Sequence, residues 1–408
     1  MANTGFNASG SVLVAGTFDT KSRELNFIAD RMKSLGISVT RVDLSTSGNA
    51  SDCDVSAADV GAFHPDGVGA VQTGDRGTSV AGMSQAFEAW IQAASNVGGI
   101  ISAGGTGGTA LSTPAMRALP LGIPKIMIST VASGDVSAYV GASDIMMLPS
   151  ISDVQGLHSI SRQIFSNAAD AMVGLVQNKQ SQQISGGDDK PNLGMTMFGV
   201  TTTAIQQISA HVSDDFECLV FHATGIGGRS MEKLADDGFL SAVLDLTTTE
   251  VCDLLFGGVF AATEDRFGAV IRKGLPYVGS VGALDMVNFG APDTVPAKYE
   301  GRTFYEHNPQ VTLMRTTAEE NTQMGHWIAD RLNQMTGPVR FFLPEGGVSA
   351  IDAPGAPFED KAARKALFDA IKERVQETEN RKLITSPHHI NDEAFAQECV
   401  AALREVTA

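Results

Sequence analysis

Cysteine is scarce in this sequence: the 408 residues contain four, Cys53, Cys218, Cys252 and Cys399, and no C-x-x-C pair. This spacing favours reduced thiols over a disulfide framework. There is no H-E-x-x-H motif, so we expect no metal site built from protein ligands. The first residues lack a basic segment followed by an apolar run, and no apolar run approaches the ~20 residues of a membrane-spanning helix. We therefore expect a cytoplasmic protein.

Positive charge is also in short supply. Lysine and arginine number 29 against 46 aspartates and glutamates, which leaves a net charge of −17. This balance argues against nucleic acid and against an anionic membrane surface as partners. It is still compatible with a local basic pocket for one phosphate, so the expected partner is a small molecule.

Glycine, by contrast, is abundant, with 43 residues that gather after short apolar runs, as α/β ligand-binding loops require. The first run, residues 12–15, precedes a helix with apolar residues at helical spacing and then a strand at residues 38–44. This order predicts a parallel sheet, and ligands of such sheets bind at the carboxyl ends of the strands.

The same alternation returns in the second half of the chain, where the runs at residues 276–289 and 311–315 are expected to join a second open sheet. A chain of 408 residues favours two domains. We predict domains at residues 1–180 and 193–408, joined by a polar linker at residues 181–192. The expected fold class is α/β, with two Rossmann-like open parallel-sheet subdomains and a ligand cleft between them.

The first glycine loop follows residues 12–15. It resembles the P-loop pattern G-x-x-x-x-G-K-S/T, but Thr20 stands where the second glycine is needed. Either this is a shorter phosphate loop with Lys21 as phosphate partner, or Asp19 or Thr20 caps a helix and Lys21 is solvated. Arg76, among glycines, either clamps an anion or is a surface turn residue.

A second glycine loop spans residues 104–109. Gly105, Gly107 and Ala110 satisfy the dinucleotide pattern G-x-G-x-x-A, but the acidic residue expected about 20 positions later is missing. We interpret the loop as a phosphate or carboxylate cradle; the alternative is tight packing of a helix on a strand. The candidate cofactor-binding residues are Gly16, Thr17, Phe18, Asp19, Lys21, Arg76, Gly104, Gly105, Thr106, Gly107, Gly108 and Thr109.

The second half contains a similar strand–loop–helix unit at residues 218–232, where backbone N–H groups at the helix N-terminus can face an anion. Polar residues also end several of its strands. Carboxylates there either act as general acid and base or hold Mg²⁺ with a phosphate, or else they only cap turns and helices. The candidate catalytic residues are His222, Glu232, Asp245, Asp285 and Asn288, and the candidate substrate-binding residues are Thr224, Gly225, Gly227, Gly228, Arg315, Gly346, Gly347 and Ser349.

Several long motifs of this half match a known pattern: GVTT at residues 199–202, FHATG at 221–225, LDLTTTE at 244–250 and GALDMVNFG at 282–290. With the two glycine loops of the first half, they resemble the UPF0261 family, the Tm-1-like ATP-binding domain proteins, over nearly the full chain. The resemblance implies two Rossmann-like subdomains, ATP as cofactor and a homodimer.

We expect an ATP-dependent enzyme that acts on a small anionic metabolite, with or without Mg²⁺. Two alternatives stay open. One is a nucleotide-sensing module without turnover, and the other is a nucleotide-independent lyase or hydrolase of a carboxylated metabolite.

Overall fold

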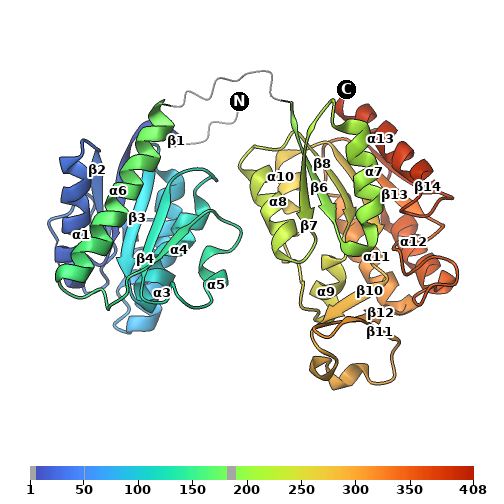
Figure 1. Ribbon diagram of the computed structural model, residues 1–408, viewed down its shortest axis with the longest axis horizontal. Coiled ribbons are helices and arrows are strands. Elements are labelled where there is room, and N and C mark those ends of the chain that lie inside the picture. Colours follow the sequence, from blue (N-terminus) through green and yellow to red (C-terminus); the bar gives the residue numbers. More distant parts are fainter. Residues whose placement is uncertain (1–5, 50, 182–189) are drawn as a thin grey trace. The chain divides into compact units, whose positions relative to one another are not determined.

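The computed structural model describes residues 6–49, 51–181 and 190–408. Contacts between residues divide the chain into two compact units, Met1–Gly186 and Gly187–Ala408. Most of the predicted linker, residues 181–192, lies outside the described residues. Each unit is built around its own parallel sheet (Figure 1).

The first unit contains a five-stranded sheet in the order β2-β1-β3-β4-β5, with every neighbouring pair parallel. The chain adds β2 on one side of β1 and β3 on the other, so the direction of winding reverses between β1 and β3. Ligands of doubly wound sheets bind outside the carboxyl ends of the strands at this switch point. The strands are β1 (Phe6–Gly16), β2 (Val39–Asp43), β3 (Val97–Gly104), β4 (Lys125–Ser129) and β5 (Met146–Pro149).

Helices cover both faces of this sheet (Figure 1). Val12 and Val14 of β1 pack with apolar residues of α1 and α6, whereas Leu13 and Ala15 pack with those of α3 and α4. Successive side chains of a strand point to opposite faces, so residues 12–15 of β1, which pack on both faces, are all apolar. The helices are α1 (Phe18–Ser34), α2 (Ala57–Gly61), η1 (Val68–Val71), α3 (Arg76–Ala93), α4 (Thr106–Ala118), α5 (Ser137–Val140) and α6 (Ser159–Ser181).

The second unit contains a six-stranded parallel sheet in the order β14-β13-β9-β8-β6-β7. Its winding reverses between β6 and β8, in the same way as in the first unit. The prediction of two Rossmann-like α/β units is therefore confirmed. The strands are β6 (Asn192–Met197), β7 (Glu217–His222), β8 (Ala242–Thr247), β9 (Tyr277–Gly282), β13 (Val339–Pro344) and β14 (Arg381–Ser386).

Two apolar clusters cover the faces of this second sheet, one with α7 and α13 and the other with α8, α10, α11 and α12. No helix within the described ranges is long and apolar enough to cross a membrane. The helices are η2 (Gly199–Thr201), α7 (Thr202–Val212), α8 (Ile226–Asp236), α9 (Glu250–Phe256), α10 (Gly268–Lys273), η3 (Pro292–Thr294), η4 (Ala297–Tyr299), α11 (Ala318–Leu332), α12 (Lys361–Arg374) and α13 (Glu393–Thr407).

A three-stranded antiparallel sheet, β10-β12-β11, was not predicted. It consists of β10 (Met286–Phe289), β11 (Phe304–Asn308) and β12 (Val311–Arg315). The expectation that residues 276–289 and 311–315 all join the large sheet is wrong for β10 and β12. The apolar run breaks at Ala283, a buried residue with φ of 56°, so the chain leaves the parallel sheet after β9.

Candidate functional site

A cavity of about 600 Å³, here called the switch-point pocket, is lined by the residues that follow β1 and β3. It brings the two glycine loops of the first half together, although they are far apart in the sequence. Of the predicted cofactor-binding residues, Phe18 and Thr109 do not line it, because both are buried beneath it. Those that do are Gly16, Thr17, Asp19, Lys21, Arg76, Gly104, Gly105, Thr106, Gly107 and Gly108.

The N-terminus of α4 opens into this pocket. Its first residue, Thr106, follows Gly105, which provides no side-chain cap. The N–H groups of Thr106, Gly107 and Gly108 are not used by any described residue of the chain. These groups and the helix dipole together attract an anion. A Cβ placed on Gly107 would meet no atom within 4 Å, so the backbone is open to a ligand there.

The N-terminus of α1 differs from that of α4. The N–H of Phe18 donates to Asp43 Oδ1 (3.1 Å), that of Asp19 donates to Ser45 Oγ (3.0 Å), and that of Lys21 donates to the Thr17 carbonyl (2.8 Å). The chain itself therefore satisfies these groups. At this end of the pocket, the side chains of Thr17, Thr20 and Lys21 line the space that an anion would occupy.

The charged lining is mixed. The Lys21 ammonium donates to the carbonyl of Val154, and the Arg76 guanidinium is exposed, with no ion pair among the described residues. The carboxylates of Asp19 and Asp153 line the same pocket. Mg²⁺ commonly binds one or two carboxylates together with substrate phosphates and waters. Within the described part of the chain, no group of three or more His, Cys, Asp or Glu residues is arranged to hold a metal by itself.

The glycine loop before α8 in the second unit also directs N–H groups at a carboxylate, but the carboxylate belongs to the chain. Gly225 N–H and Gly228 N–H donate to Glu250 Oε1 at 2.6 and 3.1 Å. A Cβ on Gly228 would lie 2.1 Å from Glu250 Oε2, so the fit is close. Glu250 was not among the predicted site residues, and this contact was not predicted from the sequence.

Thr224 and Gly227, the other predicted residues of this loop, lie against His222. The N–H of Thr224 donates to the His222 carbonyl (2.8 Å), and a Cβ on Gly227 would lie 1.8 Å from that oxygen. His222 is exposed, and its ring centroid lies 5.3 Å from that of Phe198. Substrate binding by this loop stays a prediction.

Behind the loop lies a buried arginine cluster, formed by Arg266 with Glu232, Asp245 and Glu250. The guanidinium, 1 % exposed, donates to Asp245 Oδ1 (2.9 Å), Glu250 Oε2 (3.1 Å) and Glu232 Oε1 (3.4 Å). Tyr277 OH donates to the second Asp245 oxygen (3.1 Å). Burial raises the pKa of Glu232 to about 7, although the positive charge of Arg266 opposes the shift. No sequence motif pointed to Arg266.

Asp285 and Ser349 form a separate pair. Ser349 Oγ donates to Asp285 Oδ2 (2.8 Å), while Asp285 Oδ1 is buried with no partner in the described structure. Burial raises the pKa of Asp285 to about 7. The nearby guanidinium of Arg315 donates to Phe358 O (2.8 Å) and Thr316 Oγ1 (2.9 Å), so its donors are committed within the chain.

Asn288, Gly346 and Gly347 also have partners within this unit. The N–H and amide of Asn288 donate to Asp253 Oδ1 (2.8 and 3.2 Å). Gly346 N–H donates to the His388 carbonyl (3.1 Å), and a Cβ on Gly347 would lie 2.6 Å from the His389 ring. The predicted catalytic residues therefore fall into separate clusters, each with structural partners of its own.

The fold and the pocket thus define a doubly wound α/β protein of two units, the first with an anion-type cradle at its switch point. Sequence profiles of the "Uncharacterised protein family (UPF0261)" match residues 10–181, for the N-terminal domain, and residues 190–407, for the C-terminal domain. The chain belongs to the UPF0261 family.

Several known proteins are similar in sequence to this chain over most of its length. The UPF0261 protein RA0729 of Rhizobium meliloti is 52% identical over 97% of this chain and 98% of its own. The ToMV resistance protein Tm-1(GCR237) of Solanum lycopersicum is 42% identical over 98% of this chain, which spans 56% of that longer protein. A solved dinucleotide-forming acetyl-coenzyme A synthetase, at 10% identity and a TM-score of 0.15, is too dissimilar to support an argument.

Proposed function

We propose that the first unit binds ATP in the switch-point pocket, with the triphosphate on the N–H groups of Thr106, Gly107 and Gly108. The open N-terminus of α4 carries this proposal, because its unused N–H groups face a cavity of about 600 Å³. Lys21 and Arg76, which line the same pocket, would neutralise further phosphate oxygens. These features support a polyphosphate; ATP in particular rests on the family resemblance.

The carboxylate of Asp19, which lines the pocket, would hold Mg²⁺ together with the phosphates. In this proposal the chain is an ATP-dependent enzyme of small-molecule metabolism that works as a cytoplasmic homodimer. The acceptor was expected to be an anion held by the loop before α8. Because Glu250 already occupies the N–H groups of Gly225 and Gly228, that loop supports an anionic acceptor less well than the cradle of α4 supports phosphate.

The second candidate is a nucleotide-sensing module without turnover. It is favoured by the predicted catalytic side chains of the second unit, because most of them are held in buried hydrogen bonds within the chain. Incubation with ATP separates the two candidates: an enzyme forms ADP or AMP when its acceptor is present, whereas a sensor binds ATP and leaves it intact.

Calorimetric titration of ATP, with and without Mg²⁺, tests the binding site. A charge-assisted hydrogen bond is worth about 1.5–3 kcal/mol, so Lys21→Ala and Arg76→Ala should each weaken ATP binding by roughly 10- to 100-fold. Lys33→Ala is the matched control, because Lys33 lies exposed on α1 and does not line the pocket. Equal ATP affinity in the wild type and the Lys21/Arg76 double variant would overturn the proposal.

A further inference from the structure

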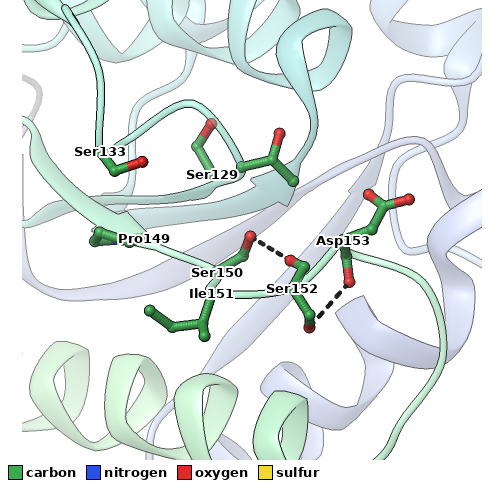
Figure 2. Close-up of a pocket in the computed structure, with 8 residues that line it drawn as sticks. Ser129, Ser133, Pro149, Ser150, Ile151, Ser152 and Asp153 are labelled. Atoms are coloured by element: carbon green, nitrogen blue, oxygen red, sulfur yellow. Dashed lines mark hydrogen bonds between the residues drawn. The ribbon is translucent and has the colours of Figure 1, made fainter.

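A second cavity, of about 540 Å³, adjoins the switch-point pocket at the carboxyl ends of β4 and β5. Asp153 lines both cavities, so they share a wall within the first unit. Figure 2 shows Ser129 and Ser133 on one side of this cavity and residues 149–153 on the other. We call it the hydroxyl pocket; its lining is Ser129, Thr130, Ser133, Pro149, Ser150, Ile151, Ser152 and Asp153.

The lining of the hydroxyl pocket does not suit an anion. It includes five hydroxyl side chains and a carboxylate but no lysine or arginine, in contrast to the switch-point pocket with Lys21 and Arg76. Hydroxyl and carboxylate groups are suited to a neutral ligand that carries hydroxyl groups of its own. A phosphate placed here would face Asp153 without a compensating cation.

Some of these hydroxyls are already engaged. Ser129 Oγ lies 2.6 Å from Thr109 Oγ1, Ser150 Oγ donates to the Ser152 carbonyl (2.6 Å), and Ser152 Oγ lies 3.2 Å from His158 Nε2. The side chains of Thr130, Ser133 and Asp153 form no hydrogen bond with the described residues of the chain. These three groups are therefore available to a ligand.

The pocket also has an apolar part, formed by Pro149 and Ile151. Ile151 has φ of 66°, a left-handed conformation that is a genuine outlier for a β-branched residue, and the residue is 74 % exposed. The segment is held in this shape by hydrogen bonds on both sides of Ile151, from Ser150 N–H to the Ser129 carbonyl (3.1 Å) and from Ser152 N–H to the Ser150 carbonyl (2.7 Å). An exposed apolar side chain on a fixed backbone beside a hydroxyl-lined cavity fits a ligand with an apolar part.

Asp153 can take the place of the acidic residue that the dinucleotide pattern requires and that is missing from its usual position in this sequence. That pattern places an acidic residue about 20 positions after the glycine loop, where it accepts hydrogen bonds from ribose hydroxyls. Here that region is the buried strand β4, but the fold brings Asp153 to the same pocket from the segment that follows β5.

We propose that the hydroxyl pocket holds the nucleoside half of the nucleotide whose phosphates occupy the switch-point pocket. The Asp153 carboxylate accepts hydrogen bonds from the ribose hydroxyls, Thr130 and Ser133 provide further hydroxyl contacts, and the base lies against Pro149 and Ile151. This inference rests on the proposed function and narrows its ligand class to ribonucleoside polyphosphates.

The test compares ATP, dATP and inorganic tripolyphosphate by calorimetry. The wild type should bind ATP at least 10-fold more tightly than tripolyphosphate, and more tightly than dATP. Asp153→Asn should weaken ATP binding about 10-fold and abolish the preference for ATP over dATP. It should leave the binding of tripolyphosphate unchanged. Ser133→Ala should weaken the binding of ATP more than the binding of tripolyphosphate. Asp30→Asn, an exposed carboxylate on α1 outside both pockets, is the control, and thermal unfolding confirms that each variant folds.

Failure of this inference is distinguishable from failure of the proposed function. If tripolyphosphate binds in a Lys21-dependent manner but ATP binds no more tightly, the phosphate cradle stands and the nucleoside site is refuted. An unchanged ratio of ATP to tripolyphosphate affinity in both Asp153→Asn and Ser133→Ala refutes it as well. If neither ligand binds the wild type, the proposed function itself fails.

Discussion

Replacing Arg266 by methionine should strongly destabilise the second unit. The wild-type guanidinium is buried and donates to three carboxylates, those of Glu232, Asp245 and Glu250. Methionine fills much of the same space but leaves the carboxylates buried without a cation. Removing one partner of a buried ion pair costs about 3–5 kcal/mol, because the remaining charge is uncompensated.

Arg272 provides a matched control in the same unit. Its guanidinium also pairs with two carboxylates, Asp236 at 2.7 Å and Asp265 at 2.8 Å, but its side chain is 46 % exposed. Exposed ion pairs contribute about 0–1 kcal/mol because water and salt screen them. The Arg272→Met variant should therefore lose little stability, and the difference between the two variants measures the effect of burial.

Urea unfolding can follow the second unit alone. The chain has two tryptophans, and Trp327 contacts the ring of Phe267, next to Arg266, at 6.0 Å. In a Trp90→Phe background, Trp327 fluorescence reports this unit. With a denaturant slope of about 3 kcal/mol per M, a loss of about 4 kcal/mol lowers the midpoint by about 1.3 M.

The loss of stability in Arg266→Met should also shrink between pH 8 and pH 5, because protonation of Glu232 removes one of the buried negative charges that the cation no longer compensates. Equal midpoints for the Arg266 and Arg272 variants would refute the view that the buried arginine cluster stabilises the unit.

Three further predictions concern single side chains. Burial raises the pKa of Glu232 from its ordinary 4.5 to about 7, so the folded state binds this proton more tightly, and wild-type stability falls as pH rises through that window. Urea titrations should therefore show that Glu232→Gln loses less unfolding free energy than the wild type between pH 5 and pH 8. The same pH dependence of stability in both proteins would contradict this. Gly228→Ala places a Cβ 2.1 Å from Glu250 Oε2, so it should destabilise by about 1–3 kcal/mol, and a wild-type melting temperature argues against the contact. Gly107→Ala meets no protein atom within 4 Å, so it should melt like the wild type while weakening ATP binding; undiminished ATP affinity speaks against the cradle.

The sequence allowed the pocket-forming loops to be predicted because their signals are local. Each loop follows an apolar run and begins a helix with apolar residues at helical spacing, and parallel strands place such loops at one edge of a sheet. For this reason Gly16, Lys21, Gly104 and Gly107 were found together without the structure. Phe18 and Thr109 were included only as neighbours in the sequence, and both point into the packed interior.

The remaining features depend on contacts between residues that are distant in the sequence. Glu250 lies 22 residues or more from Gly225 and Gly228, whose N–H groups donate hydrogen bonds to it. Arg266 lies 34 residues from Glu232. No local sequence pattern predicts which carboxylate will accept hydrogen bonds from the N–H groups of a loop, or which arginine will be buried. Asp153 escaped prediction for the same reason, because the fold brings it from beyond β5 to a loop that follows β3.

The antiparallel sheet was missed because β10 and β12 are short apolar runs that look like strands of the large sheet. The chain leaves the large sheet after β9 at Ala283, and its left-handed backbone conformation could not be predicted from the residue type.

Hydrogen–deuterium exchange with and without ATP shows directly whether the nucleotide binds the cradle of the first unit. ATP should slow exchange in peptides that contain residues 104–109, because its phosphates occupy the N–H groups of Thr106, Gly107 and Gly108. Peptides that contain residues 149–154 should also exchange more slowly, because the nucleoside covers them. Peptides covering residues 222–230 should be unchanged, since Glu250 already holds Gly225 and Gly228. Protection at residues 222–230 with none at residues 104–109 would contradict the account and move the nucleotide to the second unit.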